Sequence, residues 1–231
     1  MAGFLEKIFS GVSKYYEGLM KSKKEQISFT LADINFLSQQ LKELKMPASY
    51  ILKSASNDFD IDLLKGQVDN IDLQTFEISF VGAFYFNEKP FALFCNEDKA
   101  MKNDKFHALV ALNTDAAHSL EKVSLSEIIN KHSLPIWEEL VYRNRELNNL
   151  VKSKAPNNPW SLYRAAKGEL VPPIEYKLQI GGYPQWLIND IDFRKIKKLE
   201  FLCEFKLNEN CSIYYFNDPD LKEIVFFKQK L

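Results

Sequence analysis

The spacing of hydrophobic residues divides the chain into helical and extended segments. Over residues 4–20 apolar side chains recur at helical spacing, and lysines follow at the end of this segment. This pattern predicts an amphipathic helix, which packs either on the core of the domain or on a partner or membrane surface. A second helix is predicted over residues 31–45, with Thr30 and Asp33 as a capping box and Pro47 ending it.

The hydrophobic period changes to two between residues 50 and 112, which indicates strands. The sequences "QTFEISFVGAFYF" (74–86) and "FALFC" (91–95) are separated by the turn "NEKP", an arrangement typical of a β-hairpin. The sequence "FHALVAL" (106–112) predicts a further strand. The middle of the chain is therefore expected to be an antiparallel meander.

Helical signals return after the meander. The capping-box sequence Ser124–Glu127 predicts a short helix, and Ser133 with Pro135 predicts the start of a longer one. Residues 153–159, "SKAPNNP", contain prolines and asparagines without a large apolar residue, which indicates a boundary. The sequence "WSLYRAAKG" then predicts a short helix closed by Gly168.

The end of the chain predicts a sheet. Three strands, "LEFLCEFKL", "CSIYYF" and "EIVFFKQKL", are expected after the turn "IGGYPQW". The fold class is therefore predicted to be α+β, with an antiparallel β-meander and several helices followed by a β-rich C-terminal part. We expect the first part to span residues 1–152 and the second to span 157–231, either as two units or around one shared core.

The turn "IGGYPQW" (180–186) resembles a ligand-binding loop only superficially. It lacks both the G-x-G-x-x-G spacing of a dinucleotide site and the lysine of a P-loop. Glycine adopts positive φ without steric cost, and a proline favours extended backbone in the residue before it. We therefore expect Gly181 or Gly182 to have positive φ, Pro184 to set the turn, and Tyr183 or Trp186 to be substantially buried against the sheet.

The amino-acid composition favours a protein with a large hydrophobic core and argues against a nucleic-acid-binding protein. Hydrophobic residues make up 46% of the 231 residues and 18 are Phe, which is enough for a large core. Lys plus Arg is 30 and Asp plus Glu is 31, so the chain lacks the strongly basic character of a nucleic-acid-binding protein.

Location is predicted from the termini and the cysteines. No secretory signal and no apolar run long enough to cross a bilayer stand out in the sequence. Cys95, Cys203 and Cys211 are an odd number, which favours free thiols in a reducing cytoplasm. The alternative is a periplasmic protein exported without a recognisable signal.

Candidate catalytic and metal-binding residues are few. His107, His118 and His132 are the only histidines, and none lies in a nucleophile motif. Cys203 and Cys211 lack zinc-site spacing and are expected to be small core residues. No metal or cofactor is predicted.

An acidic row in the first part of the chain has a similarly simple interpretation. Asp58, Asp60 and Asp62 begin like a calcium loop, but Leu63 stands where the tight turn needs Gly. The row alternates with apolar residues, which favours the exposed face of a strand.

The last sixty residues or so contain, in order, a GGYP turn near a Trp, an "IYYF"-type strand, a "DL" turn and a final "V-F"-type strand. These features are Gly181–Pro184, Ile213–Phe216, Asp220-Leu221 and Val225–Phe227. This part of the chain resembles the C-terminal part of the YwqG-like family, also called the DUF1963 family. The resemblance implies a fold for this part and an association with bacterial toxin–immunity systems, and it carries over no catalytic residue.

The leading functional hypothesis is therefore an immunity protein that binds a cognate bacterial toxin domain and sterically covers its active site. The abundant aromatics suit interface anchors, and two charged faces are candidate contacts: Asp58, Asp60 and Asp62, and the helix bearing Glu138, Glu139 and Arg143. The alternatives are a hydrolytic enzyme that uses His107 or His118 with a carboxylate, and an adaptor that docks through its N-terminal helix. The oligomeric state is not predicted.

Overall fold

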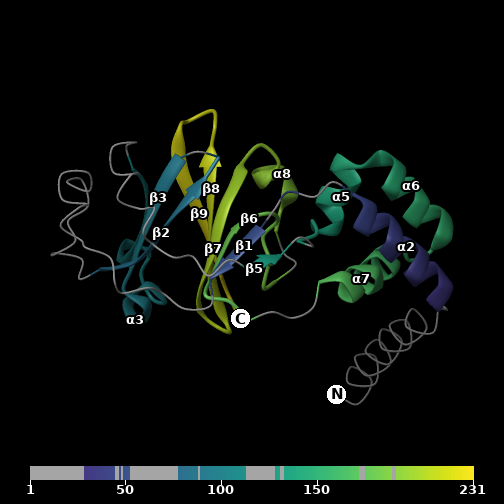
Figure 1. The fold of residues 1–231 in the computed structure, drawn as a ribbon, viewed down its shortest axis with the longest axis horizontal. Coiled ribbons are helices and arrows are strands. Elements are labelled where there is room, and N and C mark those ends of the chain that lie inside the picture. The colour runs from purple at the N-terminus through teal and green to yellow at the C-terminus, as the bar shows by residue number, and fades with distance from the viewer. Residues whose placement is uncertain are drawn as a thin grey trace, which may run out of the picture.

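The computed structural model describes residues 29–44, 47, 49–52, 78–87, 89–112, 128–130, 133–171, 175–188 and 191–231. In this part of the chain, the longer helices gather at one end of the molecule, and two antiparallel sheets with short helices beside them form the rest (Figure 1). The fold is therefore α+β, as predicted. The predicted helix at 4–20 and the capping box Ser124–Glu127 lie outside the described residues. The short helix predicted to start at this capping box is wrong where it would continue, because residues Ile128–Asn130 form a strand that pairs with Ser49–Ile51.

The helices and strands of the described part have the following bounds. The longer helices are α2 (Leu31–Glu43), α5 (Trp137–Arg143), α6 (Arg145–Lys154) and α7 (Pro159–Leu170), and the short ones are α3 (Glu97–Ala100), η2 (Asp104–Phe106) and α8 (Phe193–Ile196). The strands are β1 (Ser49–Leu52), β2 (Ser79–Phe86), β3 (Lys89–Cys95), β4 (His107–Ala111), β5 (Ile128–Asn130), β6 (Leu178–Gly181), β7 (Glu200–Asn208), β8 (Cys211–Asp218) and β9 (Glu223–Lys230).

The larger sheet joins distant segments of the chain. Its strand order is β5-β1-β6-β7-β8-β9, and β2-β3-β4 form the smaller sheet, which is the predicted meander. The three predicted C-terminal strands are β7, β8 and β9. Strand β1 pairs with β6, with Ser49 opposite Gly181, so the larger sheet includes strands from both of the predicted parts. The predicted boundary itself lies in the turn between α6 and α7, and the division into two parts stays a prediction.

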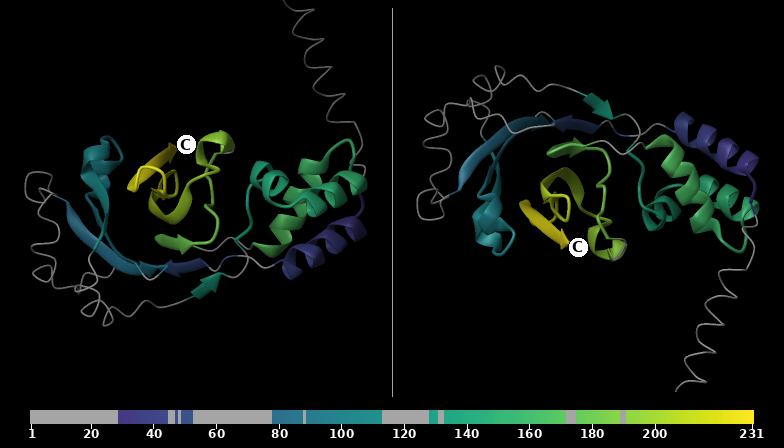
Figure 2. Two further views of the ribbon diagram at one scale, coloured as in Figure 1. Left: turned by 90° about the horizontal axis from the view of Figure 1, so that it is seen from above. Right: turned by 90° about the horizontal axis from the view of Figure 1, so that it is seen from below.

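The two sheets enclose the main hydrophobic core. Strands β2 and β3 curve around the C-terminal hairpin of β8 and β9 (Figure 2). The inner faces of both sheets supply one cluster, which includes Phe84, Phe91, Phe205, Ile213 and Tyr215. Alternation along each strand sends every second side chain of β6 to β9 to the opposite face of the larger sheet. That opposite face carries the polar residues described below.

The helices form a separate core at the end of the larger sheet. The capping box predicted for α2 is present: the Thr30 hydroxyl accepts the Asp33 N–H at 3.3 Å, and the Asp33 carboxylate accepts the Thr30 N–H at 2.9 Å. Apolar residues of α2, α5, α6 and α7 pack together, among them Leu37, Leu140 and Leu162.

Two helix boundaries differ from the prediction. The helix expected to start at Ser133 begins at Trp137 and divides into α5 and α6, because the Asn144 side chain caps α6 by accepting the Leu147 N–H. Gly168 does not close α7, which continues to Leu170. Backbone hydrogen bonds within that last turn outweigh the local preference of glycine for a helix end.

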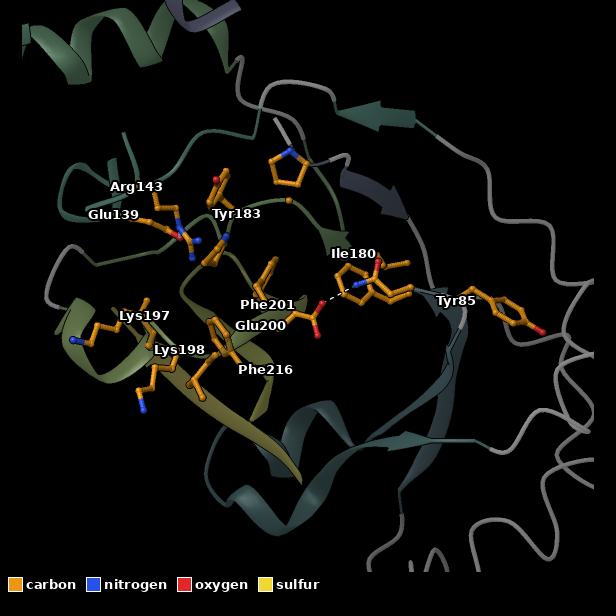
Figure 3. Close-up of a pocket in the computed structure, with 17 residues that line it drawn as sticks. Tyr85, Glu139, Arg143, Ile180, Tyr183, Lys197, Lys198, Glu200, Phe201 and Phe216 are labelled. Carbon is orange, nitrogen blue, oxygen red and sulfur yellow. Dashed lines mark hydrogen bonds and ion pairs between the residues drawn. The ribbon is translucent and has the colours of Figure 1, made fainter. Parts of the chain in front are cut away.

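The glycine turn has the predicted conformation. The φ angles of Gly181 and Gly182 are 66° and 73°. Trp186 is half-buried and packs on Tyr214 at a ring distance of 4.3 Å. Tyr183 is also half-buried, although it lies against α5 rather than on the sheet (Figure 3).

The cysteines are core residues. Cys95, Cys203 and Cys211 are buried and form no disulfide. Burial raises the pKa of Cys95 to about 12, so its thiol is protonated near neutral pH. The prediction of free, structural thiols is confirmed.

Among the described residues, no helix has both the length and the apolar character needed to cross a membrane.

Replacing Gly182 by Ala is expected to lower the free energy of unfolding by about 2 to 5 kcal/mol. The backbone is left-handed there, and an added Cβ would lie 2.6 Å from the Cβ of Ser49, which no rotamer change relieves. Urea unfolding followed by circular dichroism measures this loss. Gly168→Ala is the matched control, because a Cβ at this helical position meets no atom within 4 Å. The free energy of unfolding of Gly168→Ala is expected to rise by up to about 1 kcal/mol. Equal losses of stability in both variants would contradict this explanation.

Candidate functional site

The segment of residues 182–188, which follows β6, crosses the larger sheet without joining it. Irregular backbone that is shielded from water needs other hydrogen-bond partners, and four neighbouring strands each supply one side chain. Gln179 of β6 donates to the Tyr183 carbonyl at 2.8 Å, and Glu204 of β7 accepts the Gln185 N–H at 3.1 Å. The segment therefore rests on a row of polar side chains, one from each strand that it crosses.

The other two strands complete this row. The Tyr214 hydroxyl of β8 accepts the Leu187 N–H at 3.0 Å and donates to the Gln185 carbonyl at 3.2 Å. Gln229 of β9 accepts the Ile188 N–H at 3.1 Å and donates to the Ile188 carbonyl at 2.9 Å. We call Gln179, Glu204, Tyr214 and Gln229 the polar row.

Ser133 holds the segment from the side of the helices. Its hydroxyl donates to the Tyr183 carbonyl at 2.7 Å and accepts the Tyr183 N–H at 2.8 Å. Ser133 is fully buried, and because its hydroxyl is bonded to the Tyr183 backbone it does not cap the helix that follows it in the sequence. The turn is thus tied both to the sheet and to the chain that leads into α5.

Glu204 is the buried carboxyl group of the polar row. Its side chain is inaccessible to solvent and also accepts hydrogen bonds from Tyr176 at 2.9 Å and Ser212 at 3.1 Å. Burial raises the pKa of Glu204 to about 7, against the opposing effects of the Tyr176 hydrogen bond and the Lys206 charge. Since the Glu204 carboxylate is itself fully buried and accepts hydrogen bonds from residues of the fold, its shifted pKa has a structural explanation.

A groove of about 960 Å³ lies beside the glycine turn. Figure 3 shows Glu139, Arg143 and Tyr183 together on one side, with Phe201 and Phe216 near the centre. Lys197 and Lys198 follow α8 at the rim, and Tyr85 stands at the end formed by the β2-β3 hairpin. The groove therefore combines an aromatic floor with a rim that carries positive charge.

The best-defined polar contact in the groove is the pair of Glu139 and Arg143. Arg143 Nε donates to Glu139 Oε1 at 2.8 Å. The Glu139 side chain is 7% exposed and that of Arg143 is 44% exposed. Burial raises the pKa of Glu139, whereas the charge and hydrogen bond of Arg143 lower it. Because the Arg143 side chain is half-exposed, the N–H groups of its guanidinium that do not bond to Glu139 remain available to a further partner.

The predicted site residues are only partly brought together. The groove includes Glu139, Arg143, Gly182, Tyr183 and Pro184. Glu138 lies instead at a second cavity, and Trp186 packs against the sheet. Asp58, Asp60 and Asp62 lie outside the described residues.

His107 lies in the core rather than in the groove. Its Nδ1 is 2.7 Å from the Tyr215 hydroxyl, and its ring packs edge-on against Phe226. Burial lowers the pKa of His107 to about 4, although nearby Asp104 raises it. The imidazole is therefore neutral near neutral pH. His118 and His132 lie outside the described residues.

Sequence reasoning missed the polar row and the two lysines of the rim. A signal for the row existed, because Gln179, Glu204 and Gln229 occupy inward-facing positions of apolar strands. Such residues are buried only with hydrogen-bond partners. Their partners are backbone groups of a distant segment, which strand alternation does not identify. In the part of the chain that the structure describes, no three His, Cys, Asp or Glu side chains are grouped as metal ligands.

Comparison with known protein families, curated proteins and solved structures finds no match to this chain. The resemblance of the C-terminal residues to the YwqG-like family therefore stays a prediction from the sequence.

As pH increases, the free energy of unfolding of the Glu204→Gln variant is expected to rise relative to that of the parent protein. The folded pKa of about 7 exceeds the usual value of 4.5, so the parent loses stability as pH rises from 4.5 through 7. A neutral amide avoids this loss, which has an upper value of roughly 3 kcal/mol. The measurement is urea unfolding of both proteins at pH values from 4 to 8.

Glu200→Gln, at an exposed position of the same strand, controls for the removal of a carboxyl group from β7. A stability difference between Glu204→Gln and the parent that stays constant over this pH range would show that Glu204 is not a desolvated acid.

Proposed function

We propose that this protein is an immunity protein, which binds a cognate bacterial toxin domain and neutralises it by covering its active site. The observation that carries the proposal is the groove beside the glycine turn, with its aromatic floor and its Arg and Lys rim. The C-terminal resemblance to the YwqG-like family supports the same conclusion.

The chemistry of the groove favours binding to another protein. Tyr and Arg are the side chains most often found at the energetic centre of protein interfaces. Tyr85 is 41% exposed at one end of the groove, and the exposed part of Arg143 lies at the other. Next to Arg143, Tyr142 is 63% exposed and its ring packs against Phe193, which connects α5 with α8.

Arg143 and Tyr183 of the groove are also held in position by neighbouring residues before a partner binds. Glu139 fixes one side of the Arg143 guanidinium, and the polar row holds the turn that bears Tyr183. Contact residues that are ordered before binding lose less conformational freedom on association. A stable interface buries on the order of 1,600 Å² in total, so the groove would form its centre and the surrounding helix surfaces its rim.

The mechanism that we propose is steric. The toxin domain seats an exposed surface in the groove, and the bulk of the sheet and helices then blocks substrate from the active site of the toxin. We place this interaction in the cytoplasm, because three buried free cysteines suit a reducing compartment.

Co-expression with the protein encoded by the neighbouring gene tests the proposal. That protein is expected to arrest growth of a bacterial host, and this chain is expected to restore growth and to form a complex with it. Tyr85→Ala is expected to weaken the purified complex at least about fivefold, as measured by isothermal titration calorimetry.

A pair of charge reversals on α8 and the turn after it provides the control. Lys197 lines the groove and Lys195 does not, although both side chains are exposed. Lys197→Glu is expected to slow association and reduce affinity, whereas Lys195→Glu should retain the parent affinity. A neighbouring gene product without toxicity, or a complex that both groove substitutions leave unchanged, would contradict the proposal.

A further inference from the structure

A second cavity, of about 480 Å³, also borders the turn segment, at Gln185. It is formed between the start of α5, one face of α7 and Gln185. Its volume falls within the range typical of sites for small molecules. Its lining comprises aromatic and charged side chains: Trp137, Glu138, Trp160, Tyr163, Arg164 and Lys167.

The aromatic side chains form walls with fixed positions. Trp137 packs against Tyr163 at a ring distance of 5.6 Å, and Tyr163 donates to the Pro135 carbonyl at 2.6 Å. Trp160 lies under the Arg164 guanidinium, with 5.1 Å between Cζ and the ring centre. Trp160 and Arg164 are four residues apart on α7 and so share one face of the helix. The cavity therefore presents flat apolar surfaces next to a cation.

Lys167 is the unusual member of the lining. It is partly buried, and its backbone carbonyl accepts the Val171 N–H, whereas its ammonium group has no hydrogen bond or ion pair with any residue in the described part of the chain. Burial lowers the pKa of Lys167 to about 8, although the charge of Glu139 acts in the opposite direction. An ammonium group removed from water without a partner is costly, and an anion bound beside it would offset that cost.

Gly168 keeps this part of the cavity open. Gly168 lines the cavity at an exposed position of α7, and an added Cβ there meets no atom within 4 Å, so the cavity is open at this residue. Glycine is a poor residue for the interior of a helix, and its position beside Lys167 leaves room for a bound molecule.

We propose that this cavity is a binding site for a small aromatic anion, a planar ring that carries a carboxylate or phosphate group. The anionic group would lie at Lys167 and Arg164, and the ring would lie against Trp137 and Trp160. This site is separate from the groove and does not depend on the proposed immunity function.

Isothermal titration calorimetry with benzoate and phenyl phosphate tests this site, with benzamide as the neutral probe of matched shape. Saturable binding of at least one anion is expected, with an affinity at least tenfold above that of benzamide. Binding of both anions that is no tighter than that of benzamide, or an absence of saturable binding by both anions, would overturn the proposal.

Two substitutions connect the binding to this cavity. Lys167→Met keeps the length of the side chain and removes the charge, so it should reduce anion affinity at least tenfold without loss of helix content. Gly168→Leu places a side chain in the open space and should also abolish binding. Lys152→Met, at an exposed position of α6 outside the cavity, should bind as the parent does. Anion binding that survives both Lys167→Met and Gly168→Leu would place the ligand elsewhere and reject the assignment.

Discussion

The structure depends on the hydrogen bonding of the irregular segment 182–188. This segment lies across four strands, and its backbone groups are paired with side chains instead of with a neighbouring strand. The polar row is buried in an otherwise apolar face of the sheet, where polar groups without partners are costly. The segment and the sheet therefore specify each other, since neither satisfies its buried polar groups without the other.

This arrangement also joins the helices to the sheets. Ser133 binds the turn at Tyr183, and the chain continues from Ser133 into α5. The Tyr163 hydroxyl of α7 holds the Pro135 carbonyl of the same stretch. The turn segment borders two hollows, because Gly182 and Tyr183 line the groove and Gln185 lines the smaller cavity. Both proposed binding sites thus use a wall that the polar row keeps in position.

Local patterns predicted much of the fold and part of the groove. The capping box at Thr30, the hairpin of β2 and β3, and the three C-terminal strands follow from spacing within a few residues. The positive φ of Gly181 and Gly182 follows from the same local chemistry. Local patterns gave a wrong prediction where a distant group took up a capping side chain. Ser133 has the sequence signal of a helix start, but its hydroxyl is hydrogen-bonded to a backbone group 50 residues away.

The sequence by itself determined the α+β class, the types of most elements and the conformation of the glycine turn, because periodicity, capping and backbone sterics act between near neighbours. Only the tertiary structure decided that β1 lies beside β6, that the polar row supports residues 182–188, and that Arg143 and the lysines after α8 share a groove. These features are contacts between segments far apart in the chain. Which distant segments come into contact depends on the burial of whole faces of sheets and helices, and on the requirement that buried polar groups be paired. The spacing of neighbouring residues in the sequence does not reveal either condition.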